Sequence, residues 1–217
     1  MVKAVIFDFD GLIVDTETVW YDVFREVFAE HGCDLPLEVF GKAVGTTDEM
    51  LLAHYYQYAK KPVEADELQR LADKRYSGRM LDLQPREGVL DYLQEAKELG
   101  LQVGLASSSS RAWIEGFLER FGIRPHFEVL KTKEDVAKVK PDPALYVQAA
   151  AALGVRPVEA IAFEDSLNGS IAARRAGLHC VIVPNQVTGH LAFTDYALRL
   201  NSMSEKALKD VVQFIRG

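Results

Sequence analysis

Short apolar runs recur along the chain, and each has the length of a single β-strand. The five runs are residues 3–7, 101–106, 127–130, 160–163 and 180–183. Runs rich in β-branched residues are typical of strands that are buried on both faces. Between them, apolar positions recur every three or four residues, which is the period of an amphipathic helix. The alternation predicts an α/β fold with a doubly wound parallel sheet and a Rossmann-like core.

The spacing between the first two runs predicts an insertion. Residues 11 to 101 separate these runs, although a crossover between parallel strands needs only about a dozen residues. A predicted helix over 86–99 completes the crossover, and the remaining stretch has a helical periodicity of its own. We therefore expect a core domain of residues 1–16 and 85–217, with a helical cap domain of residues 17–84. An insertion at this point lies over the carboxyl ends of the strands, where ligands bind in open α/β sheets.

Composition and charge narrow the class of protein. Of the 217 residues, 48% are hydrophobic and 26% are charged, as in ordinary globular domains. The 25 Lys and Arg against 32 Asp and Glu give a net charge of −7, which is the wrong sign for a nucleic-acid-binding surface. No apolar run approaches the ~20 residues of a membrane span, and the N-terminus lacks a secretory signal pattern. We expect a cytoplasmic monomer with no nucleic-acid or membrane partner.

Two acidic residues follow the first predicted strand. Asp8 and Asp10 flank Phe9, and Gly11 comes next. The period of a strand sends the side chains of Asp8 and Asp10 to the same side, so we expect them to share one small space. Such neighbours stay ionised only beside a cation; otherwise one of them keeps a proton. The alternative is that both carboxylates merely solvate the end of the strand.

The second predicted strand runs into four serines, residues 107–110, before a helix that starts near Arg111. Hydroxyl groups and free backbone N–H groups at the start of a helix form a site for phosphate. An ordinary helix N-cap is the alternative, because serine is among the residues most favoured at that position.

Two further segments place charged side chains near the same edge of the predicted sheet. Lys140 precedes Pro141, which holds it in extended backbone, so its ammonium group can reach inward. Glu164 and Asp165 follow the fourth strand. The alternatives are a solvated surface lysine and a pair of acids that favours the start of the next helix through its dipole.

Because carboxyl ends of parallel strands meet at one edge of a sheet, these four segments predict a common site. Oxygen ligands without a histidine cluster suit Mg²⁺, which is completed by waters and a substrate phosphate. Lys140 and the metal would neutralise phosphoryl oxygens while a carboxylate attacks in line. The pattern therefore predicts phosphoryl transfer through an aspartyl-phosphate intermediate.

With these motifs in this order, the chain resembles the haloacid dehalogenase-like hydrolase superfamily, and within it the β-phosphoglucomutase-like branch of phosphatases with a helical cap. The matching motifs are Asp8-x-Asp10-Gly11, Ser107 after the second strand, Lys140-Pro141, and Glu164-Asp165-Ser166. The resemblance implies that Asp8 is the nucleophile and that Asp10 is the general acid and base.

The same resemblance implies the ligand contacts. Ser107, Lys140 and the backbone N–H of Ser108 would bind the transferring phosphoryl group. Asp165, with Glu164 nearby, would hold Mg²⁺ together with Asp8 and the backbone carbonyl of Asp10. Glu17, Trp20 and Thr46 are candidates for contacting the leaving group, although packing is the more common role of an aromatic residue such as Trp20 near a hinge. The expected substrate is a small phosphate monoester, a sugar or polyol phosphate by analogy with the branch.

Two other functions remain open from the sequence. A β-phosphoglucomutase-like phosphotransferase must hold a second phosphate, and relatives of that kind use an arginine in the cap. The corresponding residues 45–49 contain no arginine and two acids, which would repel a second phosphate, although Lys74 or Arg75 could substitute for the arginine. A non-enzymatic phosphate acceptor or sensor is the other alternative. Asp10 argues against it, because an acid/base beside the phosphorylated residue promotes hydrolysis.

Overall fold

A computed structural model describes residues 1–44 and 49–216. In this part of the chain, six strands form one parallel sheet in the order β3-β2-β1-β4-β5-β6. The strands are β1 (Ala4–Phe7), β2 (Gln102–Ala106), β3 (Val129–Lys131), β4 (Ala160–Glu164), β5 (His179–Ile182) and β6 (Leu198–Arg199). The predicted doubly wound sheet is confirmed. The two-residue strand β6 was not predicted, because so short a strand leaves no periodic pattern.

The register of the sheet brings the ends of three strands together. Phe7 at the end of β1 pairs with Leu105 of β2 on one side and with Phe163 of β4 on the other. Residues that follow β1, β2 and β4 therefore leave the sheet at the same edge.

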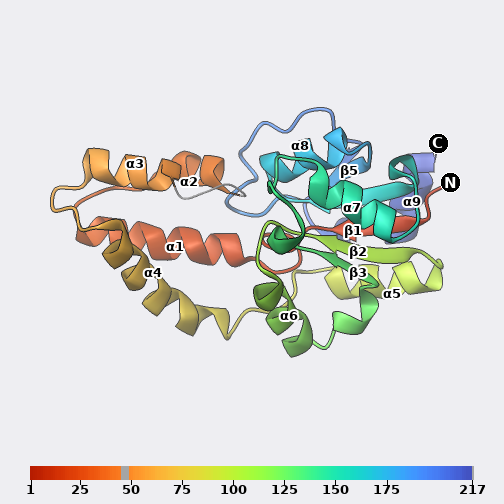
Figure 1. Ribbon diagram of the computed structural model, residues 1–217, viewed down its shortest axis with the longest axis horizontal. Helices are drawn as coiled ribbons and strands as arrows, with labels where there is room; N and C mark the ends of the chain where they lie inside the picture. The colour runs from red at the N-terminus through yellow and green to blue at the C-terminus, as the bar shows by residue number, and fades with distance from the viewer. Residues whose placement is uncertain (45–48, 217) are drawn as a thin grey trace.

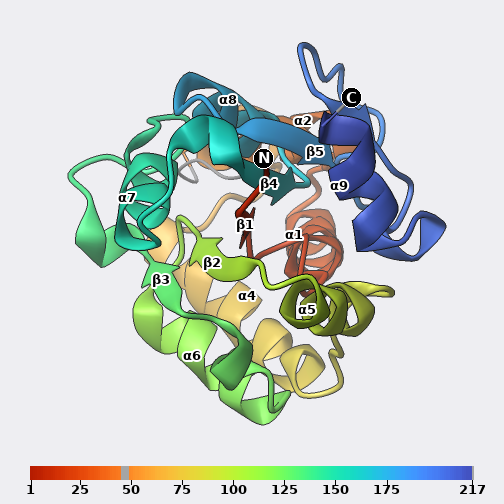
Figure 2. The same cartoon turned by 90° about the vertical axis from the view of Figure 1, so that its right-hand side faces the viewer.

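Helices cover both faces of the sheet (Figure 2). One face packs against α5 (Val89–Glu98), α6 (Arg111–Arg120) and α9 (Leu208–Arg216), through a core that includes Phe7, Leu105 and Phe163. The other face packs against α7 (Ala144–Ala152) and α8 (Leu167–Arg175), through a second core that includes Ile6 and Ala162. Because successive side chains of a strand point to opposite faces, neighbouring residues such as Ile6 and Phe7 belong to different cores.

In the described residues between β1 and α5, four helices extend away from the sheet as a cap (Figure 1). They are α1 (Thr16–Glu30), α2 (Leu37–Ala43), α3 (Glu49–Tyr58) and α4 (Ala65–Met80). The chain leaves and re-enters the core at adjacent points, since Val14 forms a bridge with Pro85 and the N–H of Arg86 donates to the carbonyl of Ile13 at 2.8 Å. The expected helical insertion is confirmed, and the domain limits at residues 17 and 84 stay a prediction.

The buried residues of the cap continue the core on the α5 side of the sheet, and ion pairs lie on the outer surface of the cap. Phe24 and Phe28 of α1 are buried against apolar residues of α3 and α4. On the outside, Arg75 and Arg79 of α4 pair with Glu30 and Glu26 of α1 at 2.7 and 2.8 Å. Neither Arg75 nor Lys74, the two basic residues considered for a second phosphate, lines the cavity between the cap and the edge of the sheet. Among the described helices, none is long and apolar enough to cross a membrane.

Candidate active site

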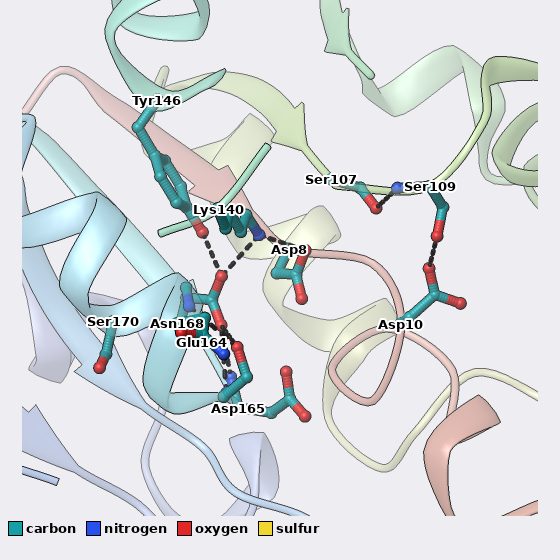
Figure 3. Close-up of polar contacts among 12 residues, drawn as sticks. Asp8, Asp10, Ser107, Ser109, Lys140, Tyr146, Glu164, Asp165, Asn168 and Ser170 are labelled. Carbon is teal, nitrogen blue, oxygen red and sulfur yellow. Dashed lines mark hydrogen bonds and ion pairs between the residues drawn. The ribbon is translucent and has the colours of Figure 1, made fainter. Parts of the chain in front are cut away.

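Four charged side chains from three separate segments meet at the carboxyl edge of the sheet (Figure 3). Asp8 follows β1 directly, Glu164 is the last residue of β4, Asp165 comes next, and Lys140 lies in the loop before α7. All four are buried. The structure thus brings these four of the predicted site residues together.

Lys140 lies at the centre of this group. Its side chain is 2% exposed, and its Nζ donates hydrogen bonds to Asp8 Oδ1 and, at 2.6 Å, to Glu164 Oε1. Burial lowers the pKa of Lys140, but the carboxylates of Asp8 and Glu164 outweigh burial and raise this pKa above its usual value. The ammonium group is therefore charged throughout the physiological range. The alternative of a solvated surface lysine is excluded by its burial.

Glu164 has hydrogen-bond partners for both of its carboxylate oxygens. Oε1 accepts from Lys140 and from the hydroxyl of Tyr146 at 2.7 Å. Oε2 accepts from the backbone N–H groups of Asp165 and Ser166, at 3.1 and 3.2 Å, and from the hydroxyl of Ser166. The carboxylate therefore fixes both Lys140 and the turn after β4. This packing needs the glycine at position 169, because a Cβ there would lie 1.8 Å from Glu164 Oε1.

Asp165 is fully buried, and only one of its two carboxylate oxygens is paired. Oδ2 accepts from Asn185 Nδ2 at 2.8 Å, whereas Oδ1 has no hydrogen-bond partner within the described chain. Burial, together with the charges of Asp8 and Glu164, raises the pKa of Asp165 well above its usual value. A buried carboxylate oxygen without a partner is costly unless a cation or proton joins it.

The acidic side chains form a group of the size that holds a metal ion. Asp8, Glu164 and Asp165 each offer a carboxylate oxygen, and these three oxygens lie within 4.8 Å of one another. Burial and the nearby Glu164 raise the pKa of Asp8 to about 7, although Lys140 acts in the opposite direction. One ammonium group thus faces three buried carboxylates, which leaves a deficit of positive charge. The unpaired oxygen and this charge deficit both fit a divalent cation with oxygen ligands.

Asp10 is held apart from the acidic group. Its Oδ1 accepts from the hydroxyl of Thr16 and from the indole N–H of Trp113, each at 2.9 Å, and its Oδ2 accepts from the hydroxyl of Ser109 at 2.5 Å. Asp8 and Asp10 line the same cavity, but their carboxylates have different partners (Figure 3). The reason is that β1 ends at Phe7, so the strand period does not extend to Asp10.

The serines after β2 differ in their contacts. Ser110 is the N-cap of α6, because its hydroxyl accepts from the N–H of Trp113 at 3.3 Å. Ser107 and Ser108 line the cavity, and Ser108 Oγ is buried with no partner among the described residues. The N-cap alternative therefore holds for Ser110, and a phosphate site at Ser107 and Ser108 stays a prediction.

A cavity of about 510 Å³ lies between this edge of the sheet and the cap. The predicted leaving-group residues Glu17 and Trp20 line it, and Thr46 lies outside the described residues. Trp20 also packs, since its ring stacks on that of Tyr76 with centroids 3.6 Å apart. Within the described part of the cap, none of the residues that line the cavity is Lys or Arg; its two basic lining residues, Lys133 and Lys140, belong to the core.

Several contacts of the site were not predicted from the sequence. The carboxylate of Glu164 accepts from Tyr146, and that of Asp165 accepts from Asn185. The carboxylate of Asp10 accepts from Thr16, Ser109 and Trp113. Tyr146 and Trp113 appear in the sequence only as apolar positions of helices. Asn185 has a signal in the sequence, because it follows β5 at the same edge of the sheet.

Known proteins resemble the chain over nearly its whole length. The family model of haloacid dehalogenase-like hydrolases matches residues 5–183. A Bacillus subtilis (strain 168) protein named "Putative phosphatase YhcW" is 53% identical over 96% of this chain and 95% of its own. Hexitol phosphatase B of Escherichia coli (strain K12) is 31% identical over 97% of both chains. The crystal structure of CbbY from Rhodobacter sphaeroides in complex with phosphate is 32% identical, with a TM-score of 0.74 over 94% of this chain and 96% of that one.

These matches agree with the site geometry. The family model covers most of the chain and ends at Val183, so it includes all four predicted motifs. The chain therefore belongs to the haloacid dehalogenase-like hydrolase family.

Proposed function

We propose that the protein is a Mg²⁺-dependent phosphatase that hydrolyses a small phosphate monoester through an aspartyl phosphate on Asp8. The observation that carries this proposal is the pairing of Asp8 with the buried ammonium group of Lys140, beside an unpaired oxygen of Asp165. A carboxylate, a fixed cation and a site for a second cation then surround one point at the edge of the sheet. Such an arrangement stabilises the charge of a transferring phosphoryl group.

In the proposed first step, a carboxylate oxygen of Asp8 attacks phosphorus. The new Asp8–phosphorus bond forms as the ester P–O bond breaks, and Asp10 gives its proton to the leaving oxygen. In the second step, Asp10 takes a proton from water, whose oxygen attacks phosphorus; the Asp8–phosphorus bond breaks, which restores the Asp8 carboxylate and releases inorganic phosphate. Lys140 lies where it can contact phosphoryl oxygens, and Ser107 and the backbone N–H of Ser108 lie in the same cavity wall.

Asp8 and Asp165 are the side chains that we propose for Mg²⁺, together with the backbone carbonyl of Asp10. Both oxygens of Glu164 already accept hydrogen bonds, so we assign Glu164 chiefly to fixing Lys140 and only secondarily to the metal. Bound Mg²⁺ would supply positive charge to the phosphoryl oxygens. The other charges around the transferring phosphoryl group would come from Asp8, Lys140, Glu164 and Asp165.

The substrate that we propose is a sugar or polyol phosphate. Support comes from the hexitol phosphatase relative and from the cap, which places Glu17 and Gln69 in the cavity wall. Carboxylate and amide groups bind hydroxyl groups well, whereas a second phosphate needs cations. Because the described cap residues of the cavity are not basic and residues 45–48 include neither Lys nor Arg, hydrolysis is favoured over mutase action. The proposed enzyme acts as a monomer, with a cap of residues 17–84.

A screen of phosphate release tests this function. Purified protein is assayed with hexitol phosphates, sugar phosphates, nucleotides and phosphorylated organic acids, each with Mg²⁺ and with chelator. We expect turnover of hexitol or sugar monophosphates that depends on Mg²⁺ and is lost in Asp8→Asn. Turnover that persists in the chelator, or in Asp8→Asn, would contradict the metal or the nucleophile respectively.

A further inference from the structure

Among the described residues, the indole N–H of Trp113 is one of three donors that hold the carboxylate of Asp10. Thr16 and Trp113 both donate to Oδ1, and Ser109 donates to Oδ2. Trp113 lies in the first turns of α6, so it reaches Asp10 from the core side. Nothing in the helical periodicity of this segment distinguishes Trp113 from residues that only pack.

The ring of Trp113 also contacts the cap. It stacks on Tyr76 of α4 with centroids 5.8 Å apart and an interplanar angle of 22°. Tyr76 in turn stacks on Trp20 of α1, and on the core side Trp113 packs edge-on against Phe117. Three aromatic rings from α1, α4 and α6 therefore form one continuous stack that ends at Asp10.

We propose that Trp113 is a positioning residue for Asp10, and that the stack with Tyr76 makes this position depend on the cap. The proposal rests on the function proposed above, in which Asp10 is the acid and base. An indole N–H can only donate, whereas the hydroxyls of Thr16 and Ser109 can donate or accept. The oxygen that Trp113 holds, Oδ1, is thus kept as an acceptor, and the proton that Asp10 transfers is carried on Oδ2.

The placement of the proton on Asp10 Oδ2 predicts which step of the reaction depends on Trp113. In the first step the Asp8–phosphorus bond forms, the ester P–O bond breaks, and the proton on Asp10 Oδ2 moves to the leaving oxygen. A poor leaving group, such as a polyol alkoxide, needs that proton, but p-nitrophenolate leaves without it. Loss of the indole N–H should therefore slow the first step only for the poor leaving group.

The test compares Trp113→Phe with wild type in rapid-quench single turnovers of sorbitol 6-phosphate and p-nitrophenyl phosphate. General acid catalysis contributes ~10²–10⁴-fold in total, and one of three donors is lost, so we expect release of sorbitol to slow by about 10-fold or more. Release of p-nitrophenol should change by less than about twofold, and KM should hardly change. Asp10→Ala should show the same selectivity with a larger effect.

Tyr92→Phe is the matched control, because it also removes one hydrogen-bond donor from an aromatic side chain, here the hydroxyl that donates to the carbonyl of Lys206 at 2.8 Å, and Tyr92 neither holds Asp10 nor lines the cavity. It should alter both first-turnover rates by a common factor. An equal slowing of both substrates in Trp113→Phe, or no slowing of either, would overturn the proposal. If Trp113→Phe fails to fold, Tyr76→Leu keeps the indole N–H but removes the ring of the cap, and it should give the same selectivity with a smaller effect.

These outcomes are separable from failure of the proposed function. If that function were wrong, wild-type protein would give no p-nitrophenol in the first turnover, or Asp10→Ala would leave the release of sorbitol unchanged. If only the role of Trp113 were wrong, wild type and Asp10→Ala would behave as described and Trp113→Phe would not be selective.

Discussion

Lys140 donates a hydrogen bond to Asp8 across 132 positions of sequence. The same ammonium group binds Glu164, so a single cation links the residue after β1 to the last residue of β4. The buried pair is a condition for the proposed chemistry, because a carboxylate that must attack a phosphate anion needs positive charge beside it.

Removal of the Lys140 charge should destabilise the protein. Lys140→Met keeps the length of the side chain but leaves Asp8 and Glu164 buried without their common partner. Breaking a buried pair in this way costs about 3 kcal/mol of unfolding free energy, to be measured by urea denaturation without metal at pH 8. Lys3→Met is the control, since the ion pair of Lys3 with Glu159 is largely exposed on the lysine side and should contribute less than about 1 kcal/mol. Equal losses in both variants would contradict the account of Lys140.

Asp165→Asn should make the metal-free protein more stable but abolish its stabilisation by Mg²⁺. In chelator the variant should unfold at a higher temperature than wild type, because it removes a buried carboxylate whose Oδ1 is unpaired. Added Mg²⁺ should stabilise wild type but not the variant. Asp195→Asn is the control, because that side chain is 78% exposed; its thermal shift with Mg²⁺ should equal that of wild type. An Asp165→Asn protein that keeps the full Mg²⁺ shift would show that the metal binds elsewhere.

Metal binding should release protons near neutral pH. Without a cation the pKa of Asp8 is raised to about 7, so at pH 6 the folded protein still holds a proton that an unfolded chain has lost. Mg²⁺ must displace that proton, and its affinity should therefore rise between about pH 6 and pH 8 and level off above. Isothermal titration calorimetry in buffers of different ionisation enthalpy counts the protons directly. An affinity that does not change over this range, with no proton release, would be inconsistent with the raised pKa.

Gly169→Ala should disturb the site through Glu164. The added Cβ would lie 1.8 Å from Glu164 Oε1, so the carboxylate that fixes Lys140 must move. Overpacking of this kind costs about 1–3 kcal/mol, and we expect activity to fall at least tenfold. Gly78→Ala in α4 is the matched control, because a Cβ there meets nothing within 4 Å; it should stabilise the helix by about 0.5–1 kcal/mol and leave turnover unchanged. Comparable activity in the two variants would argue against the role of Glu164.

The sequence predicts the location of the site because of one general rule of parallel sheets. Asp8, Ser107 and Glu164 each follow or end a buried apolar run, and the ends of adjacent parallel strands meet. The motifs could therefore be placed together without coordinates. The helical cap followed in the same way from a crossover that was too long for one helix.

The orientation of Asp10 and its contacts could not be derived in this way. The strand ends at Phe7, so the side chain of Asp10 follows the turn rather than the pleat, and it binds Trp113 from a helix 103 positions away. Trp113 has an apolar face that fits the helical period, and the period gives no sign of where its N–H points. The pairing of Asn185 with Asp165 depends on the loop after β5, whose course no periodicity describes.

The central claim is that Asp8 accepts the phosphoryl group. Asp10→Asn should slow hydrolysis of the intermediate more than its formation from p-nitrophenyl phosphate, so the variant is mixed with this substrate and Mg²⁺, quenched in acid and analysed by mass spectrometry. We predict that the protein gains the mass of one phosphoryl group, located on the peptide that contains Asp8, and that the additional substitution Asp8→Asn abolishes the gain. A phosphoryl group on any other residue, or release of p-nitrophenol in amounts far above the enzyme with no phosphorylated protein at any time, would contradict the account.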